Sequence, residues 1–279
     1  MDHLLSEWNE LKEKLKDKFI FLFLDYDGTL TPIVETPREA IISCETKELL
    51  EKLSKIPKCK IAIISGRALK DIKNKVNLEN IIYVGNHGLE IEDPKIKFES
   101  PISSRYKDIL EYIKTDLIKE LSLIKGVILE DKGFSLSVHF RLVDRKKIPQ
   151  VKAIVHESAI PYLVRNEIKI KPGKMVLEIR LPGNWDKGKV VLWLLARQRF
   201  LIGEKDLIPI YIGDDKTDED AFKALKNEGL TVFVDRPRLS HARYYLKNTE
   251  EVTDLLHKIL VLHNDSTNNA RISKSKRAI

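Results

Sequence analysis

The stretch Phe19-Ile-Phe-Leu-Phe-Leu24, followed directly by Asp25-Tyr-Asp-Gly-Thr29, decides the fold. Six consecutive apolar residues without alternation are typical of a strand that is buried on both faces, as in a parallel sheet. Parallel sheets bind their ligands outside the carboxyl ends of their strands, which is where the two carboxylates lie. The stretch therefore predicts a central strand of an α/β domain with a polar site at its end.

Three further segments repeat the pattern of a short aliphatic run that polar residues close. They are Lys60 to Ile64 before Ser-Gly-Arg, Ile81 to Val84 before Gly-Asn-His-Gly, and Pro209 to Ile212 before Gly-Asp-Asp. Helical patterns lie between or after them, at 45–56, 68–76, 187–200, 217–226 and 250–262. Strands that alternate with helices predict a doubly wound, Rossmann-like parallel sheet with all four polar clusters at one edge.

The middle of the chain changes character. A long amphipathic helix is expected at 106–124, a second helix at 150–159 and a strand at 174–180. Between the helices, apolar and polar side chains alternate: Phe134, Leu136, Val138 and Phe140 against Ser135, Ser137, His139 and Arg141. Alternation is typical of an antiparallel strand with one buried face and one polar face. An α+β unit is therefore expected to interrupt the parallel core, with its polar face toward the core's active edge.

Length and composition agree with two units. A chain of 279 residues can bury one large core and a smaller companion. We expect core segments at 1–100 and 183–262, an inserted cap domain at 101–182, and a basic tail at 263–279 that is disordered.

Composition also argues against several classes of function. The longest dense apolar run is far shorter than the roughly 20 residues that span a bilayer, so a cytoplasmic protein is expected. Cys44 and Cys59 lack metal-ligand spacing and are interpreted as buried thiols. The net charge of +7 is concentrated partly in the tail. Because no zinc-finger or aromatic-plus-basic signature accompanies this charge, nucleic-acid binding is not expected.

Asp25 and Asp27 are the first candidates for catalysis. Two carboxylates two positions apart can face one ligand and do different work, one as a nucleophile and the other as a proton donor and acceptor. Carboxylate nucleophiles form aspartyl phosphates, and a cluster of hard anionic oxygens favours Mg²⁺ over zinc. The alternative is a polar turn that only ends the strand.

The second acidic cluster is Gly213-Asp-Asp-Lys-Thr-Asp-Glu-Asp220. Thr217 followed by Asp220 resembles a helix N-cap with an acid three positions later, so a structural role is expected for that half. This structural role does not account for Asp214 and Asp215, because adjacent carboxylates repel unless a cation lies between them. A metal ion is expected there.

Ser65 and Lys187 are candidates for binding an anion. Ser65 precedes Gly66 and Arg67 between a strand and a helix, where its hydroxyl and nearby N–H groups can hold phosphate oxygens; an ordinary N-cap is the alternative. Lys187 opens a helix, a position that the helix dipole makes unfavourable for a cation. A solvated lysine is the alternative there.

In this order the motifs resemble the haloacid dehalogenase superfamily of phosphatases and, more narrowly, the trehalose-6-phosphate phosphatases. The resemblance covers about residues 19–262, and one departure is Asp186, where many relatives have asparagine. The strings that carry it are Asp25-Tyr-Asp-Gly-Thr-Leu-Thr-Pro-Ile33, Ile64-Ser-Gly-Arg67, Gly85-Asn-His-Gly88, Ser137-Val-His-Phe-Arg141, Trp185-Asp-Lys-Gly188 and Gly213-Asp-Asp-Lys-Thr-Asp-Glu-Asp-Ala-Phe222.

The resemblance implies a reaction in two steps. Asp25 would attack phosphorus, and Asp27 would protonate the leaving sugar oxygen and then activate water. Mg²⁺ would be held by the Asp25 side chain, the Asp27 backbone carbonyl and Asp214, with Asp215 and Asp218 in support.

The resemblance also implies which residues contact the substrate. Phosphate would be held by Lys187, Thr29, Ser65, Gly66 and Arg67. The sugar would meet Glu130 and Lys132 of a Glu-x-Lys motif, Glu178 of Gly173-Lys-Met-Val-Leu-Glu178, and His87, His139 and Arg141. For the residues of the insertion, a solvated charge pair on a strand face is the alternative.

The expected function is therefore Mg²⁺-dependent hydrolysis of trehalose 6-phosphate, with a trehalose-6-phosphate synthase as a possible partner. One alternative is a phosphatase of the same fold for another sugar phosphate, such as glucosylglycerol phosphate or mannosyl-3-phosphoglycerate. A second alternative is a module that senses a sugar phosphate without turning it over.

Overall fold

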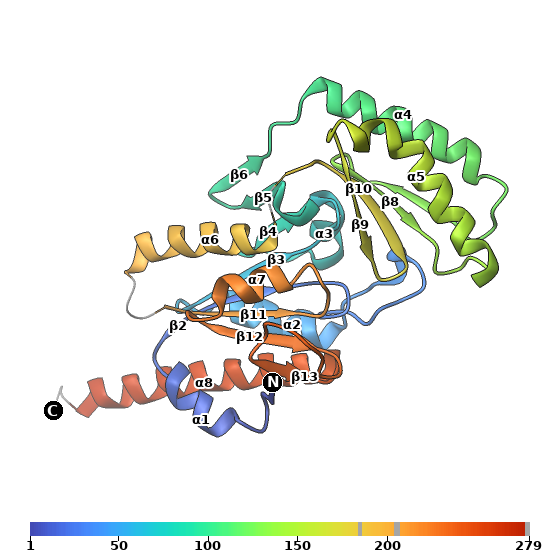
Figure 1. The fold of residues 1–279 in the computed structure, drawn as a ribbon. Coiled ribbons are helices and arrows are strands. Elements are labelled where there is room, and N and C mark those ends of the chain that lie inside the picture. The colour runs from blue at the N-terminus through green and yellow to red at the C-terminus, as the bar shows by residue number, and fades with distance from the viewer. Residues whose placement is uncertain (184–185, 204–206, 277–279) are drawn as a thin grey trace.

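The computed structural model contains two sheets that lie one above the other (Figure 1). It describes residues 1–183, 186–203 and 207–276, with side chains up to residue 264. The larger sheet has nine strands and forms the core; the smaller sheet has four strands and belongs to the insertion.

The core sheet is parallel except at one end. In spatial order its strands are β1 (Asp2–His3), β13 (Tyr244–Leu246), β12 (Leu230–Val234), β11 (Leu207–Gly213), β2 (Phe19–Leu24), β3 (Cys59–Ile64), β4 (Ile82–Gly85), β5 (Glu90–Asp93) and β6 (Ile96–Glu99). The strands from β1 to β4 pair in parallel, whereas β5 and β6 pair antiparallel. Strand order reverses at β2, which lies between β3 and β11, so the sheet has its switch point there.

Both faces of β2 are buried, which explains its uninterrupted apolar sequence. Ile20, Leu22 and Leu24 point into one hydrophobic cluster, and Phe21 and Phe23 point into the other. The first cluster is covered by α1 (Trp8–Leu15), α2 (Cys44–Ser54), α3 (Leu69–Val76) and α8 (Thr249–Lys276). The second is covered by α6 (Lys187–Ile202) and α7 (Glu219–Leu225), which lie on the opposite side of the sheet (Figure 1).

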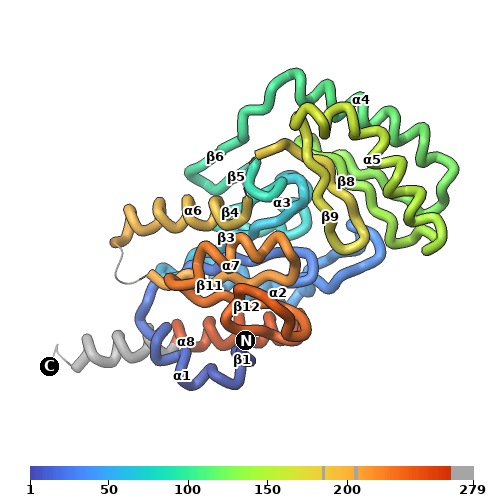
Figure 2. The backbone as a smooth tube through the Cα atoms, viewed as in Figure 1, coloured from blue at the N-terminus to red at the C-terminus, as the bar shows by residue number. Residues whose placement is uncertain are grey.

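We call residues 104–180 the insert. The backbone enters it after β6 and returns to the core after the last strand of the smaller sheet (Figure 2). Its elements are α4 (Ser104–Leu121), β7 (Ile128–Asp131), β8 (Ser135–His139), α5 (Ile148–Val164), β9 (Lys169–Gly173) and β10 (Val176–Arg180), and the strands pair antiparallel in the order β7-β8-β10-β9. Leu136 and Val138 pack under α4 and α5, as the alternation predicts. The opposite, polar face of this sheet is turned toward the core (Figure 1).

The predicted doubly wound sheet with an α+β insertion is confirmed. The four predicted core strands lie within a few residues of their observed positions, and so do the starts of the predicted helices; the last helix, predicted to end at 262, continues as α8 to Lys276. The short strands β1, β5, β6, β7, β9, β12 and β13 were not predicted. Several of them, such as the sequence Ile-Lys-Phe-Glu of β6, mix charged and apolar residues over too few positions for a pattern to emerge.

Two local predictions are wrong. Cys44 is exposed, because it is the first residue of α2 and follows the N-cap Ser43, on a turn that faces solvent; Cys59 is buried as predicted. Thr217 does not cap α7. The helix begins at Glu219, after Asp218. The Asp218 carboxylate accepts hydrogen bonds from the backbone N–H groups of Asp214 and Asp215 and does not cap the helix.

Two expectations concern the ends of the chain and the membrane. The predicted disordered tail falls largely on residues 265–279, whose side chains lie outside the described residues, and it stays a prediction. Among the described helices, none is both long enough and apolar enough to cross a bilayer.

Candidate active site

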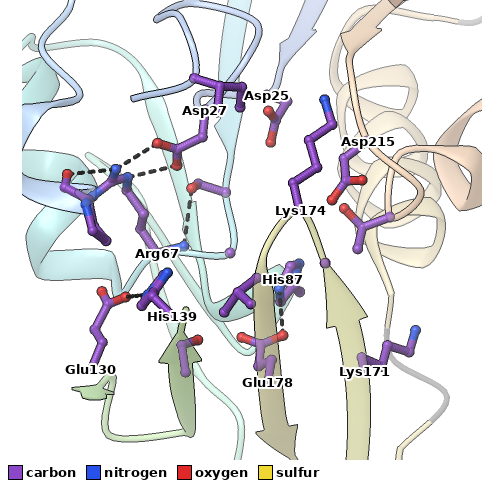
Figure 3. A pocket seen from close by; sticks show the side chains of 18 of the residues that line it. Asp25, Asp27, Arg67, His87, Glu130, His139, Lys171, Lys174, Glu178 and Asp215 are labelled. Atoms are coloured by element: carbon purple, nitrogen blue, oxygen red, sulfur yellow. Dashed lines mark hydrogen bonds and ion pairs between the residues drawn. The ribbon is translucent and has the colours of Figure 1, made fainter. Parts of the chain in front are cut away.

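A cavity of about 210 Å³ lies between the carboxyl edge of the core sheet and the polar face of the insert (Figure 3). It collects almost all of the predicted site residues. Those that line it are Asp25, Asp27, Ser65, Gly66, Arg67, His87, Glu130, Lys132, His139, Arg141, Glu178, Lys187, Asp214 and Asp215. Thr29 and Asp218 are fully buried and lie outside the lining.

Lys187 lies at the base of the cavity between two carboxylates. Its Nζ donates to Asp25 Oδ1 at 2.6 Å and to Asp218 Oδ1 at 2.7 Å, and its side chain is only 3% exposed. Burial alone would lower the pKa of Lys187, but the charges of Asp218 and Asp25 outweigh it and raise that pKa well above 10.5. Lys187 is thus a buried cation, which explains why it opens a helix against the dipole.

Asp218 organises the loop that follows β11. Its Oδ2 accepts from the backbone N–H groups of Asp214 and Asp215, at 3.1 Å and 2.9 Å. Its Oδ1 also accepts from the hydroxyl of Tyr211, at 2.7 Å. With both oxygens engaged, Asp218 positions the loop and Lys187 and does not offer a free lone pair toward the cavity.

Asp214 faces the cavity from this loop. Its Oδ2 accepts from Lys174 Nζ at 2.5 Å, and its Oδ1 is buried without a hydrogen-bond partner among the described residues. Burial raises the pKa of Asp214 to about 7, although Lys174 opposes the shift. A further positive charge, in addition to Lys174, would therefore favour the ionised form of this carboxyl group at neutral pH.

This arrangement fits a small divalent cation. One ligand atom from each of Asp25, Asp214 and Asp218 lies within 4.8 Å of the others. The backbone of Gly28 closes over the same point, because a Cβ there would lie 2.0 Å from Asp214 Oδ2. Hard carboxylate and carbonyl oxygens suit Mg²⁺. Since Asp218 is saturated by four donors, Asp25 and Asp214 are the side chains available to such an ion.

Ser65 and Gly66 form one wall of the cavity. The N-cap of α3 is Ala68, so Ser65 is not a helix cap, and its hydroxyl accepts from the Arg67 N–H at 3.1 Å. Gly66 is required here because a Cβ would lie 2.6 Å from the His87 ring. Thr29 Oγ1 is buried without a partner among the described residues, and its predicted contact with phosphate stays a prediction.

Arg67 binds Asp27 with two parallel hydrogen bonds (Figure 3). Nε and Nη2 donate to the two oxygens of Asp27 at 2.8 Å and 2.6 Å, and the other donors of Arg67 reach Asp71 and the Pro37 carbonyl. This bidentate contact occupies both carboxylate oxygens of Asp27. Asp27 must leave Arg67 to donate a proton.

Glu178 of the insert is joined to the core (Figure 3). Its oxygens accept from His87 at 3.0 Å, from Lys132 at 3.2 Å and from Ser135 at 3.1 Å. Burial raises the pKa of Glu178, but its contacts with His87 and Lys132 outweigh burial and hold that pKa well below 4.5. Lys132 also donates to the Gly66 carbonyl at 2.9 Å. These contacts join the insert to the loops that follow β3 and β4.

The polar face of the insert carries a row of side chains across all four strands. Strand register places Glu130 beside Ser137, Ser137 beside Glu178, and Glu178 beside Lys171. Each of these side chains lines the cavity. Ser137 Oγ is buried and has no hydrogen-bond partner among the described residues, so it can still bond to a hydroxyl group. Glu130 accepts from His139 at 2.8 Å.

Sequence reasoning missed four residues of this site. Lys174 lies in the string Gly173-Lys-Met-Val-Leu-Glu178, but only Glu178 of that string was given a role. Ser137 is placed on the polar face of the predicted strand but is given no role at the site, and Lys171 lies on β9, which was not predicted. Tyr211 reads as an ordinary buried strand residue, and no sequence signal marks its bond to Asp218.

Comparison with known proteins agrees with the geometry. The family model for trehalose-phosphatase matches residues 23–249. Trehalose-phosphate phosphatase B of Arabidopsis thaliana is 35% identical over 92% of this chain and 70% of its own length. A probable trehalose-phosphate phosphatase of Oryza sativa subsp. japonica is 36% identical over 90% of this chain and 69% of its own.

Solved structures show the same architecture. A trehalose-6-phosphate phosphatase related protein has a TM-score of 0.73 and 26% identity, over 88% of this chain and 99% of the other. The C-terminal domain of the Candida albicans trehalose-6-phosphate phosphatase has a TM-score of 0.78 at 23% identity, over 93% and 97% of the two chains, and supports the fold alone.

The doubly wound sheet, the α+β insert and the acidic site between them define a phosphoric monoester hydrolase of the haloacid dehalogenase fold. The family match extends over most of the chain, and relatives about one third identical are covered along most of their length. The chain belongs to the trehalose-phosphatase family.

The burial of His87 beside Glu178 leads us to expect that the free energy of unfolding depends on pH. Burial lowers the pKa of folded His87 below its usual 6.5; the charge of Glu178 and its hydrogen bond oppose this shift, and the charges of Lys187 and Lys132 add to it. The unfolded chain therefore takes up this proton first, and stability present above pH 6.5 is lost as the pH falls from there toward the folded pKa. The free energy of unfolding of the wild type should fall between about pH 7 and pH 5.5.

His87→Gln should make that pH dependence shallower, because the titrating group is gone. Urea unfolding of both proteins across the range measures the slopes, and His156→Gln, at an exposed position of α5, is the matched control. Equal slopes for the wild type and His87→Gln would contradict a buried neutral His87.

Proposed function

We propose that this chain hydrolyses trehalose 6-phosphate to trehalose and phosphate. Membership of the trehalose-phosphatase family supports the substrate, which is the one that the relatives' names give. The observation that carries the proposal is Lys187, buried between Asp25 and Asp218 at the base of a cavity roofed by polar residues of the insert. A phosphoryl group fits the charged base, and sugar hydroxyls fit the roof.

Asp25 is the proposed nucleophile. It is 5% exposed, lines the cavity and is held by the Lys187 bond at 2.6 Å, so its carboxylate is fixed for attack on phosphorus. Lys187 stays beside the phosphoryl group and neutralises charge on its oxygens as the bond to the sugar breaks. The hydroxyl of Ser65 and the N–H groups near Gly66 would bind the same oxygens.

Asp25, the backbone carbonyl of Asp27 and Asp214 would hold Mg²⁺, with Asp215 and Asp218 in support. When bound, the ion supplies Lewis-acid stabilisation of phosphoryl charge. Asp214 is suited to this place by its buried, unpartnered Oδ1.

Asp27 is the proposed proton donor and acceptor. It would release Arg67, bind a proton from solvent, pass that proton to the leaving sugar oxygen and then take one from the water that attacks the aspartyl phosphate. Arg67 supports this role by position, since its two hydrogen bonds hold Asp27 at the cavity wall. Its own predicted contact with phosphate would require it to release Asp27 or Asp71.

We propose that residues 101–182 act as a cap domain over a core formed by 1–100 and 183–262. Glu130, Lys132, Ser137 and Glu178 would bind sugar hydroxyls, with His87, His139 and Arg141 around them. Glu178 and Lys132 already bind core groups, so the sugar would exchange with these contacts.

The other proposals are narrower. Another sugar phosphate of similar size would fit the same cavity. A module that senses a sugar phosphate without hydrolysing it is disfavoured, because Asp25, Asp27 and Lys187 are all present. The two unpaired thiols are in keeping with a reducing compartment, and we propose the cytoplasm. Association with a trehalose-6-phosphate synthase stays a prediction.

A panel of phosphate esters tests the proposed function. Phosphate release with Mg²⁺ should be fastest for trehalose 6-phosphate, and Asp25→Asn should lose several powers of ten in rate while keeping its thermal stability. The control is Cys44→Ser, at an exposed position of α2 outside the cavity, which should retain full activity. A strong preference for a different sugar phosphate would overturn the substrate, and substantial turnover by Asp25→Asn would overturn the nucleophile.

The row on the insert predicts a separation between sugar binding and chemistry. Glu130→Ala and Ser137→Ala should each reduce kcat/KM for trehalose 6-phosphate by about tenfold, since a hydrogen bond to a charged or buried group is worth about 1.5 kcal/mol. Hydrolysis of p-nitrophenyl phosphate, which has no sugar, should stay within about threefold of the wild type. Parallel losses on both substrates would mean that these residues support the fold and not the sugar.

A further inference from the structure

Strand β6 forms one edge of the core sheet, at the end farthest from β1. Within the described part of the chain, its only strand partner is β5. Its last three residues, Lys97, Phe98 and Glu99, are exposed. An exposed edge strand offers a row of backbone N–H and C=O groups to a further strand.

The hydrogen bonds to β5 determine which groups point outward. Ser100 N–H donates to the Leu89 carbonyl on the β5 side at 2.7 Å. Successive residues of a strand alternate in direction, so Phe98 and Ile96 also bond toward β5. The N–H and C=O groups of Lys97 and Glu99 therefore point away from the sheet.

Only some registers can use these outward groups when β6 meets a second β6 antiparallel. Lys97 must lie opposite Lys97 or Glu99 of the other copy, since these residues carry the free groups. Pairing Lys97 with itself, or Glu99 with itself, places like charges face to face, which is unfavourable. Pairing Lys97 with Glu99 places opposite charges face to face, twice in one symmetric pair. The backbone pattern and the charges thus select the same register.

The same register brings two aromatic groups together. Phe98 is the centre of symmetry and would lie opposite Phe98 of the other copy as a close, non-hydrogen-bonded pair. Phe98 is 37% exposed and lies beside Trp193 of α6, which is 40% exposed, with ring centroids 6.5 Å apart. Phe98 is on the α6 side because it pairs with Ile91, which belongs to the cluster under α6.

We propose that two copies of this chain associate through β6, antiparallel about Phe98, to form one continuous sheet across the dimer. The proposal does not depend on the proposed function, because β6 lies outside the active-site cavity. Pro94 and Pro101 bracket the strand and limit the ladder to a few bonds. A short ladder gives a small interface, so the dimer is weak and depends on concentration.

Sedimentation velocity of the full chain from about 1 µM to about 1 mM tests for this dimer. The sedimentation coefficient of the wild type should rise with concentration. Lys97→Glu and Glu99→Lys should each raise the dissociation constant by about tenfold or more, since each places like charges opposite each other in two places. Lys95→Glu makes the same change of charge beside the ladder, opposite Pro101 in this register, and should have a smaller effect.

Mixing the two single variants makes the test specific. Lys97→Glu carries two acidic groups at the edge and Glu99→Lys carries two basic groups, so an equimolar mixture should form a heterodimer although neither variant self-associates. Lys97→Glu/Glu99→Lys in one chain should also restore the dimer. Phosphatase activity reports whether each variant is folded. A wild type that remains a monomer throughout the range, or a mixture that does not associate, would overturn the proposal.

Discussion

The buried ammonium group of Lys187 is the interaction on which the site depends. It joins three elements that are distant in sequence, because Asp25 ends β2, Asp218 follows β11 and Lys187 begins α6. Two buried carboxylates at the switch point of the sheet would repel each other without a cation between them. Tyr211 and the loop N–H groups complete the set by saturating Asp218. Asp25, the proposed nucleophile, is thereby held in place without substrate, as electrostatic catalysis requires.

The insert covers the charged base of the cavity, and polar contacts join the insert to the core. Glu178 reaches His87 and Lys132 reaches the Gly66 carbonyl, so residues expected to bind sugar also hold the two units together. Lys174 similarly reaches Asp214 from the β9–β10 turn. A substrate must compete for these groups. If these residues bind the sugar as proposed, the substrate would replace contacts that now join the insert to the core.

The central strand, the reactive edge of the sheet and the polar face of the insert could be predicted from the sequence, because each is marked by a local pattern of residue types. The run that ends at Leu24 predicts a doubly buried strand, and two carboxylates after it predict the reactive edge. The alternation around Val138 predicts the polar roof. Short strands such as β9 could not be predicted from the sequence, because their formation depends on tertiary contacts. Cys44 was wrongly predicted to be buried, and Thr217 was wrongly predicted to cap a helix. The N-cap residues of α2 and α7 are Ser43 and Asp218, and the local sequence pattern does not show this.

The proposed reaction depends on covalent transfer of the phosphoryl group to Asp25 beside Lys187. Rapid acid quenching of the enzyme during turnover of trehalose 6-phosphate, followed by mass spectrometry of its peptides, measures this transfer directly. One phosphoryl group is expected on the peptide that contains Asp25, and none in Asp25→Asn. A phosphoryl group on another residue, or phosphate release with no phosphorylated peptide at any quench time, would contradict it.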